Sequence, residues 1–409
     1  MNQPGAADPL HVLALNSGSS SLKFGLYEVR SAQVTRLISG EAERVGRSRS
    51  AFVATGAAGA VVCDEAGPLP TPHAVVDRVV RLLADVDAPA PGAIGHRVVH
   101  GGPALRRHCR IDDAFLRQLR AAQSFAPLHT PTILAFIRSA RALYPGLAQV
   151  ACIDTVFHAA MPARASVLPL PAAMRALGIR RYGFHGLSCE SVVHQLGQGP
   201  SNRCPARLLI AHLGNGASVT AVRDGVSIDT SMGLTPSGGL IMGTRSGDLD
   251  PGVLVYLARE QGFDAAMLED LVDHRGGLAG ISGLDGDMRT LHATAGSNAD
   301  AALAIRMFCY AVRKQLAAMW VVLDGAEAIV FTGGIGEHDA AVRQEVCTGL
   351  ASLGVRLDAA RHRALVNPVS SGISSCEVHV LPSMEDEQIA RHTGALVRSA
   401  PAVRTADGP

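Results

Sequence analysis

Two arginines stand where a phosphoryl group could be held during transfer. Arg97 closes an apolar strand, where a guanidinium is costly unless an anion pairs with it. Arg245 lies in the glycine-flanked loop 241–248, which lets a ligand come close to the backbone. Guanidinium groups bind phosphate oxygens through two parallel hydrogen bonds. Together the arginines predict a clamp on a phosphoryl group, and for Arg97 an ion pair at a domain interface is the structural alternative.

Two histidines are weaker candidates for the same site. His185 stands on a short turn between Gly183 and Gly186, next to an aromatic ring and before a helix. A ligand-binding role and an ordinary structural role are both open for it. His129 precedes a predicted helix, where such residues often serve only as caps.

Two carboxylates suggest a metal site. Asp154 ends a predicted strand and Glu385 opens the last predicted helix. Mg²⁺ prefers hard oxygen ligands and is often bound through one or two carboxylates. Helix capping is the alternative for Glu385, and the neighbouring Asp386 and Glu387 leave the choice of ligand open.

Glycine-rich turns that suit an anion recur along the chain. Segments 12–24 and 208–219 each consist of an apolar strand, a turn rich in Gly, Ser and Asn, and a second strand. Such turns direct several backbone N–H groups into one concavity. Lys23, one of only two lysines, stands in the first turn. Two copies half a chain apart predict a duplicated fold with a nucleotide clamped between its halves.

The elements that must position these residues alternate between strands and helices, with hairpins at the start of each half. Such alternation predicts α/β domains with mixed sheets and a ligand in the cleft between them. Strands are expected at 11–17, 21–29, 35–44, 92–100, 148–154, 206–223, 226–230, 328–332 and 378–381. Helices are expected at 73–86, 112–123, 130–143, 251–273, 298–323 and 385–397, with a glycine turn at 333–337.

Composition excludes several classes of protein. With 409 residues, two domains are expected, and a net charge of +1 predicts no nucleic-acid or membrane partner. The eight cysteines are scattered without zinc-site spacing and are expected to be reduced thiols. No signal peptide or run of about 18 apolar residues is present, so the expected location is the cytoplasm.

Seven motifs, in order, resemble the acetate kinase family over about residues 12–395. They are Asn-Ser-Gly-Ser-Ser-Ser-Leu-Lys (16–23), Gly-His-Arg-Val-Val-His-Gly-Gly (95–102), Arg-Arg-Tyr-Gly-Phe-His-Gly (180–186), His-Leu-Gly-Asn-Gly (212–216), Asp-Thr-Ser-Met-Gly-Leu-Thr-Pro (229–236), Met-Gly-Thr-Arg-Ser-Gly-Asp (242–248) and Phe-Thr-Gly-Gly-Ile-Gly-Glu (331–337). The resemblance implies a duplicated two-domain actin-like (ribonuclease H-like) ATPase fold with an interdomain active-site cleft. The implied domains are 11–154 with 386–409, and 155–385.

The resemblance also implies an activity and a set of site residues. The reaction is reversible in-line transfer of the ATP γ-phosphoryl to acetate, with Mg²⁺ or alternatively Mn²⁺, in a homodimer. The implied catalytic residues are Arg97, Asp154, His185 and Arg245, and those around Mg²⁺ are Asn16 and Glu385. Acetate is expected to contact Arg97, Val99, Leu128, His129, Phe184 and Pro236. The nucleotide is expected to contact Lys23, His212, Gly214, Asn215, Gly216, Gly333, Gly334, Ile335 and Gly336.

Two alternatives remain open at this level. The first is a relative that prefers propionate, a substrate one methylene longer than acetate; the size of Val99 keeps the pocket small and favours acetate. A nucleotide-switch protein of the same fold would need the phosphate turns but not the arginines. The sequence departs from the family pattern at Thr130, His338 and Met384, and the last two leave nucleotide preference open.

Overall fold

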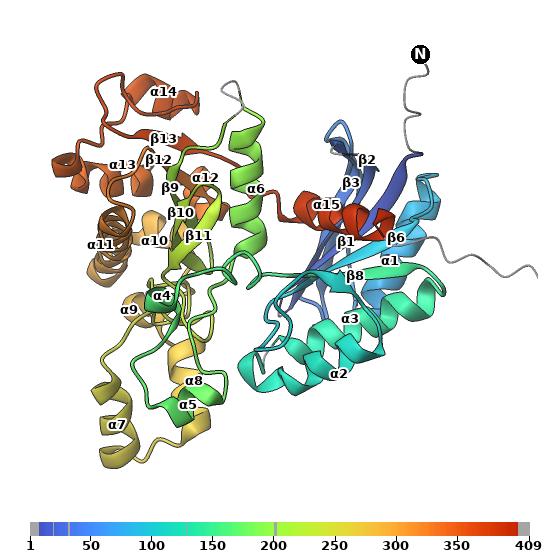
Figure 1. Ribbon diagram of the computed structural model, residues 1–409, viewed down its shortest axis with the longest axis horizontal. Helices are drawn as coiled ribbons and strands as arrows, with labels where there is room; N and C mark the ends of the chain where they lie inside the picture. The colour runs from blue at the N-terminus through green and yellow to red at the C-terminus, as the bar shows by residue number, and fades with distance from the viewer. Residues whose placement is uncertain (1–7, 19, 32, 128, 200–202, 400–409) are drawn as a thin grey trace, which may run out of the picture. The chain divides into compact units, whose positions relative to one another are not determined.

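The computed structural model describes residues 8–18, 20–31, 33–127, 129–199 and 203–399. The chain forms two compact units (Figure 1). The first combines residues up to Val156 with those from Met384 onward, and the second is Phe157–Ser383. Glu385 therefore belongs to the first unit. No helix in the described part of the chain has the length and apolar character needed to span a membrane.

The first unit is built on a mixed sheet whose strands run in the order β5-β4-β3-β2-β1-β6-β8-β7. Neighbours from β5 to β1 pair antiparallel, whereas β1, β6 and β8 pair parallel. The strands are β1 (Leu10–Ser17), β2 (Ser21–Arg30), β3 (Gln33–Glu43), β4 (Ser50–Gly56), β5 (Val61–Gly67), β6 (Ala93–Val98), β7 (Cys109–Arg110) and β8 (Ala148–Ile153).

Helices cover both faces of this sheet. They are α1 (Pro72–Asp85), α2 (Asp113–Ala121), α3 (Thr130–Leu143) and α15 (Glu385–Arg398). Leu13 and Ile94 share one core with α1 and α3. Gly95 is adjacent to Ile94, so it points to the opposite face, where a Cβ would collide with Ile389 and Thr393 of α15. The glycine thus allows the last helix to pack closely against the central strands.

The second unit has a smaller mixed sheet, ordered β11-β10-β9-β12-β13. Its strands are β9 (Arg207–Leu213), β10 (Ala217–Arg223), β11 (Val226–Thr230), β12 (Ala328–Thr332) and β13 (Glu377–Val380). Helix α6 packs Cys189 and Val192 onto Leu208 and Ile210, and α11 contacts β9, β10 and β11. The helices are α4 (Ala163–Ser166), α5 (Ala172–Ala176), α6 (Gly186–Gly197), α7 (Pro251–Glu260), α8 (Ala265–Asp273), α9 (Gly277–Ser282), α10 (Met288–Thr294), α11 (Ala299–Val322), α12 (Gly333–His338), α13 (Ala340–Gly349) and α14 (Ala359–Ala364).

The two sheets share one topology, which confirms the predicted duplicated α/β fold. The order β3-β2-β1-β6-β8 in the first unit matches β11-β10-β9-β12-β13 in the second. In each, the first three strands form an antiparallel meander and the last two run parallel to the central strand. The first sheet adds the hairpin β4–β5, which the sequence pattern did not predict, and β7.

Two predicted elements differ from the structure. The predicted helix 251–273 is two helices, α7 and α8, because Gly262 between them has φ +70°. The predicted glycine turn at 333–337 is the short helix α12. The buried Arg343 side chain donates from Nη1 to the carbonyls of Gly336 and Glu337 at 2.9 and 2.8 Å, which satisfies the end of a helix that glycine propensity disfavours.

Candidate active site

The predicted residues of the first unit gather at the carboxyl ends of three neighbouring parallel strands. Asn16 is near the end of β1, Arg97 near the end of β6, and Asp154 follows β8 directly. Carboxyl ends of parallel strands meet at one edge of a sheet, where α/β proteins commonly bind ligands. Three side chains that are far apart in the sequence are therefore brought together by strand order alone.

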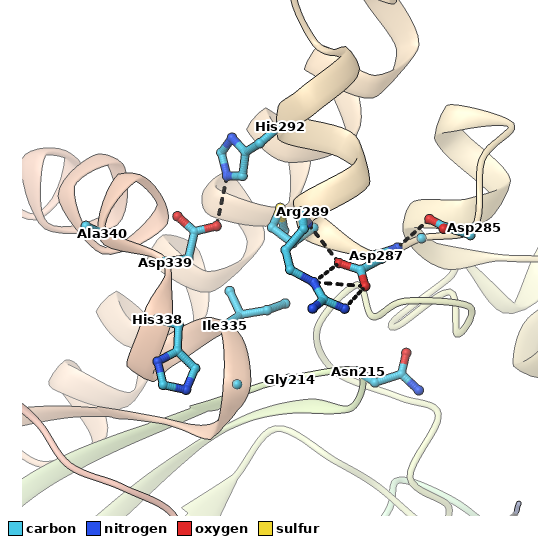
Figure 2. Close-up of a pocket in the computed structure, with 13 residues that line it drawn as sticks. Gly214, Asn215, Asp285, Asp287, Arg289, His292, Ile335, His338, Asp339 and Ala340 are labelled. Carbon is cyan, nitrogen blue, oxygen red and sulfur yellow. Dashed lines mark hydrogen bonds and ion pairs between the residues drawn. The ribbon is translucent and has the colours of Figure 1, made fainter. Parts of the chain in front are cut away.

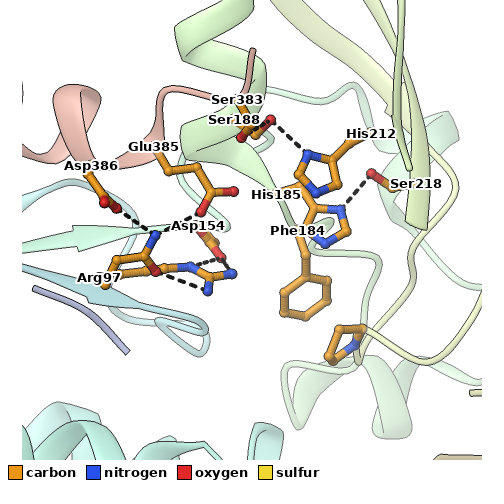
Figure 3. A network of polar contacts seen from close by, with 12 residues as sticks. Arg97, Asp154, Phe184, His185, Ser188, His212, Ser218, Ser383, Glu385 and Asp386 are labelled. Atoms are coloured by element: carbon orange, nitrogen blue, oxygen red, sulfur yellow. Dashed lines mark hydrogen bonds and ion pairs between the residues drawn. The ribbon is translucent and has the colours of Figure 1, made fainter. Parts of the chain in front are cut away.

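Arg97 is anchored by Asp154, as Figure 3 shows. Its Nε and Nη2 donate to Asp154 Oδ2 at 2.8 and 2.6 Å, and its Nη1 donates to Asn16 Oδ1 at 3.3 Å. The Asp154 side chain has no exposed surface, and that of Arg97 is 17% exposed. Burial lowers the pKa of Arg97, but the carboxylates of Asp154 and Glu385 more than compensate and raise it overall. The guanidinium is thus a fixed positive charge with its orientation set by a buried carboxylate.

Asn16 also connects the strand edge to the last helix. Its Nδ2 donates to Glu385 Oε2 at 3.0 Å and to Asp386 Oδ1 at 2.8 Å. Both carboxylates are partly buried in the first turn of α15. Burial raises the pKa of Asp386 to about 6, against the lowering effect of the bond from Asn16. Two hard-oxygen groups close together in a shielded place are the donors that Mg²⁺ prefers.

The structure also describes three other predicted residues of the first unit. Val99 follows β6 and is buried, with 4% of its surface exposed. His129 lies at the N-cap position of α3. Lys23 is exposed on β2, opposite Asn16 in the strand register. The predicted acetate-pocket residue Leu128 lies outside the described residues.

The second unit has its own cluster of predicted residues, centred on two stacked histidines. His185 has a left-handed backbone, with φ +57°, directly before α6. Such a conformation is uncommon for a residue with a side chain and is found preferentially at functional sites. Its ring is buried, stacks on His212 at 4.1 Å between centroids, and lies with Nδ1 2.9 Å from Ser218 Oγ. Phe184, buried beside it, turns its carbonyl to His158 Nε2 at 2.9 Å.

Nitrogen atoms converge on the glycine turn between β9 and β10. A Cβ at Gly216 would lie 3.1 Å from His185 Nε2 and 3.3 Å from Arg245 Nη1. Arg245 Nη1 also donates to the carbonyl of Pro236 at 3.1 Å. A Cβ at Gly333 would lie 3.2 Å from His212 Nε2 and 2.8 Å from the carbonyl of Leu213. Side chains at these two glycines would occupy the space into which the donors point.

Beside this turn is a cavity of about 800 Å³, large enough for a nucleoside phosphate (Figure 2). Of the predicted nucleotide-binding residues, Gly214, Asn215, Gly334 and Ile335 line it. His212 lies near the end of β9, Gly216 lies in the turn between β9 and β10, and Gly333 and Gly336 lie in α12, whereas Lys23 belongs to the first unit. The remaining lining residues are Asp285, Gly286, Asp287, Met288, Arg289, His292, His338, Asp339 and Ala340.

Sequence reasoning missed the segment around Asp285 and His292. His292 Nε2 is 2.8 Å from Asp339 Oδ2, and Arg289 donates to Asp287, so polar groups line this side of the cavity. The sequence signal available was Asp285-Gly286-Asp287, a turn with two carboxylates directly before a helix. Gly286 has φ +77° and comes close to the backbone of Gly243, which ties the turn to the Arg245 loop.

The model of the acetokinase family matches residues 11–391. The chain belongs to the acetokinase family. An acetate kinase from Methylocella silvestris is 42% identical over 94% of this chain and 98% of its own, and one from Rhizobium meliloti is 40% identical over 95% and 99%. Among solved structures, a propionate kinase from Francisella tularensis has a TM-score of 0.87 at 34% identity. An acetate kinase from Porphyromonas gingivalis has a TM-score of 0.84 at 33% identity; both cover 95% of this chain and 100% of their own.

Membership of the acetokinase family confirms the resemblance of the seven motifs. Because the relatives are matched over nearly their whole length, both units belong to the shared architecture. It is the two-domain actin-like ATPase fold that the motifs implied.

Proposed function

We propose that this protein is an acetate kinase, which transfers the γ-phosphoryl of ATP reversibly to acetate and forms acetyl phosphate and ADP. The observation that carries the proposal is the combination of a cavity sized for a nucleoside phosphate on one unit with Arg97 anchored by Asp154 on the other. A nucleotide-switch protein has no need of an arginine fixed at a strand edge. The named relatives and the family support the same activity.

Each half-site has a role in this proposal. Arg97 and Arg245 offset the negative charge of the phosphoryl group and of the carboxylate, since both reactants are anions. His185 donates to the phosphoryl oxygens, and Asp154 holds Arg97 in place. Val99, Leu128, His129, Phe184 and Pro236 surround acetate, and the glycine turns of the second unit hold the nucleotide. The predicted location of the substrates between the units remains a prediction.

Mg²⁺ is the proposed cofactor, with Mn²⁺ as the alternative cation. Glu385 and Asp386 supply the oxygen donors, and Asn16 holds both carboxylates by its amide. When bound, such an ion neutralises charge on the β- and γ-phosphates. Asn16 Oδ1 accepts from Arg97, so the amide couples the metal carboxylates to the catalytic arginine.

A homodimer is the proposed assembly. All residues of α7 and α8 are described, and none is buried. Helix α7 nevertheless exposes Val253, Val255 and Tyr256, and α8 exposes Met267. Apolar helices without a buried face suit a second copy of the chain. Light scattering should give twice the chain mass, and Val255→Asp should shift it to the monomer; a monomeric wild-type protein would contradict this.

Propionate is the second candidate acceptor, favoured by the structural likeness to the Francisella propionate kinase. Val99 occupies the proposed acetate pocket and limits its size, so acetate is preferred in our proposal. The cytoplasmic location and the absence of nucleic-acid partners remain predictions from composition.

The deciding experiment measures ADP release from Mg-ATP with acetate, propionate, butyrate or no acid, and traps the product with hydroxylamine. We expect acetyl hydroxamate to form and acetate to give the highest kcat/KM. Release of ADP that is independent of any acid would refute the kinase proposal and favour a nucleotide switch.

A further inference from the structure

Ser383, the last residue of the second unit, is connected to the phosphate turns by two routes. Its Oγ donates to Ser188 Oγ at 3.1 Å, and Ser188 Oγ lies 2.8 Å from His212 Nδ1 (Figure 3). Its backbone N–H donates to Glu337 Oε1 at 2.9 Å, and the same oxygen accepts the N–H of Gly333, also at 2.9 Å. Both routes end at the turns beside the cavity.

The order of donors along the first route favours one tautomer of His212. Ser188 Oγ accepts from Ser383, so its own proton can be donated to His212 Nδ1. A ring nitrogen that accepts a hydrogen bond carries no proton, which leaves the proton of a neutral imidazole on the other nitrogen. In His212 that nitrogen is Nε2, the atom 3.2 Å from the Cβ position of Gly333.

We propose that Ser188 and Ser383 are positioning residues that hold His212 as the Nε2–H tautomer, a hydrogen-bond donor to a phosphate oxygen of the nucleotide. Glu337 holds the Gly333 turn to Ser383, so donor and turn are fixed to the same residue. Ser188 is fully buried, which shields the hydroxyl that contacts His212 from water. The identity of the phosphate rests on the proposed function, whereas the tautomer does not.

The first test determines the tautomer directly by NMR of protein with ¹⁵N-labelled histidine. The signals of His212 are assigned as those that disappear in the His212→Asn variant. We expect wild-type His212 to be protonated on Nε2 alone. Ser188→Ala should produce a mixture of tautomers, and Ser188→Thr, which keeps a hydroxyl, should restore the wild-type pattern. Ser227→Ala is the matched control, because Ser227 forms the equivalent pair with His158 Nδ1 at 2.8 Å and does not touch His212.

The second test reads the effect on turnover. Loss of the hydroxyl in Ser188→Ala or Ser383→Ala should lower kcat about tenfold. In a His212→Ala background the same serine substitutions should cause no further loss of kcat, because the two serines act through the His212 ring. Additive losses, or a wild-type His212 protonated on Nδ1, would overturn the proposal.

Two controls separate the possible failures. If Ser188→Ala does not fold, Ser383→Ala removes the same hydroxyl chain at a half-buried position. A different outcome is that the wild-type protein shows the Nε2–H tautomer and the serine variants lose it, while acetate does not stimulate ADP release. That outcome would support the role of the two serines and refute the proposed function.

Discussion

Arg97→Leu should impair both catalysis and stability, for reasons that can be separated. The substitution keeps an apolar stem on β6 but removes three hydrogen bonds, two to Asp154 and one to Asn16. Removing one such preorganised contact with a developing charge typically lowers kcat by about 10²–10³-fold. We therefore expect at least that loss in acetate-dependent ADP formation.

The stability effect follows from the burial of Asp154. With its side chain fully buried, loss of the guanidinium leaves a carboxylate without its counter-charge, which costs roughly 3–5 kcal/mol for such pairs. For a unit of this size the melting temperature should fall by about 10 °C. In the double variant Arg97→Leu/Asp154→Asn the uncompensated charge is gone, so most of the stability should return while activity stays low.

The assay compares wild type, Arg97→Leu, Asp154→Asn and the double variant by calorimetry and by hydroxamate formation. Recovery of stability without recovery of turnover is the expected outcome. The reasoning would be refuted if Arg97→Leu kept near wild-type turnover, or if the double variant were as unstable as Arg97→Leu. The first result would remove the arginine from the chemistry, and the second would show that the buried charge is not the source of the instability.

Three further predictions concern the metal, pH and the acyl pocket. A chelator should abolish turnover, and Glu385→Gln should raise the Mg²⁺ concentration for half-maximal rate about tenfold; an unchanged requirement would contradict its role. Burial lowers the pKa of His158 to about 4, below its ordinary 6.5, so its contribution to stability is full above pH 6.5. We expect about 3 kcal/mol to be lost as the pH falls toward 4, measured by denaturant unfolding, with NMR titration of the ring as the check. Val99→Ala should raise kcat/KM for propionate relative to acetate about tenfold, and an unchanged ratio would place Val99 outside the pocket.

The part of the site that sequence could predict is the part set by local motifs and strand order. Asn16, Arg97 and Asp154 each stand at the end of an apolar run, and parallel pairing of β1, β6 and β8 brings such ends together. The glycine turns can be predicted from their composition, because few residues other than glycine allow hydrogen-bond donors to converge so closely.

The part that sequence could not predict depends on contacts between distant segments. His292 and Asp339, 47 residues apart, are hydrogen-bonded neighbours in the wall of the cavity, and Ser188 and Ser383 are 195 residues apart. The same reason explains α12, since glycine-rich local sequence indicates a turn whereas Arg343 supplies the bonds that keep it helical. Local patterns cannot encode partners supplied by another element.

The position of α15 has a consequence for how the chain is synthesised. This helix follows every other described element in the chain, yet it packs on β1, the earliest of them, with Ile389, Ala390 and Thr393 fully buried. The first unit therefore cannot complete its core until the whole second unit, one continuous segment, has been synthesised. Translation that stops before residue 385 would leave the apolar α15 side of the first sheet exposed and deprive Asn16 of both carboxylates. A chain truncated in this way thus differs from the full chain in two respects: it exposes an apolar surface, and it lacks the proposed metal site.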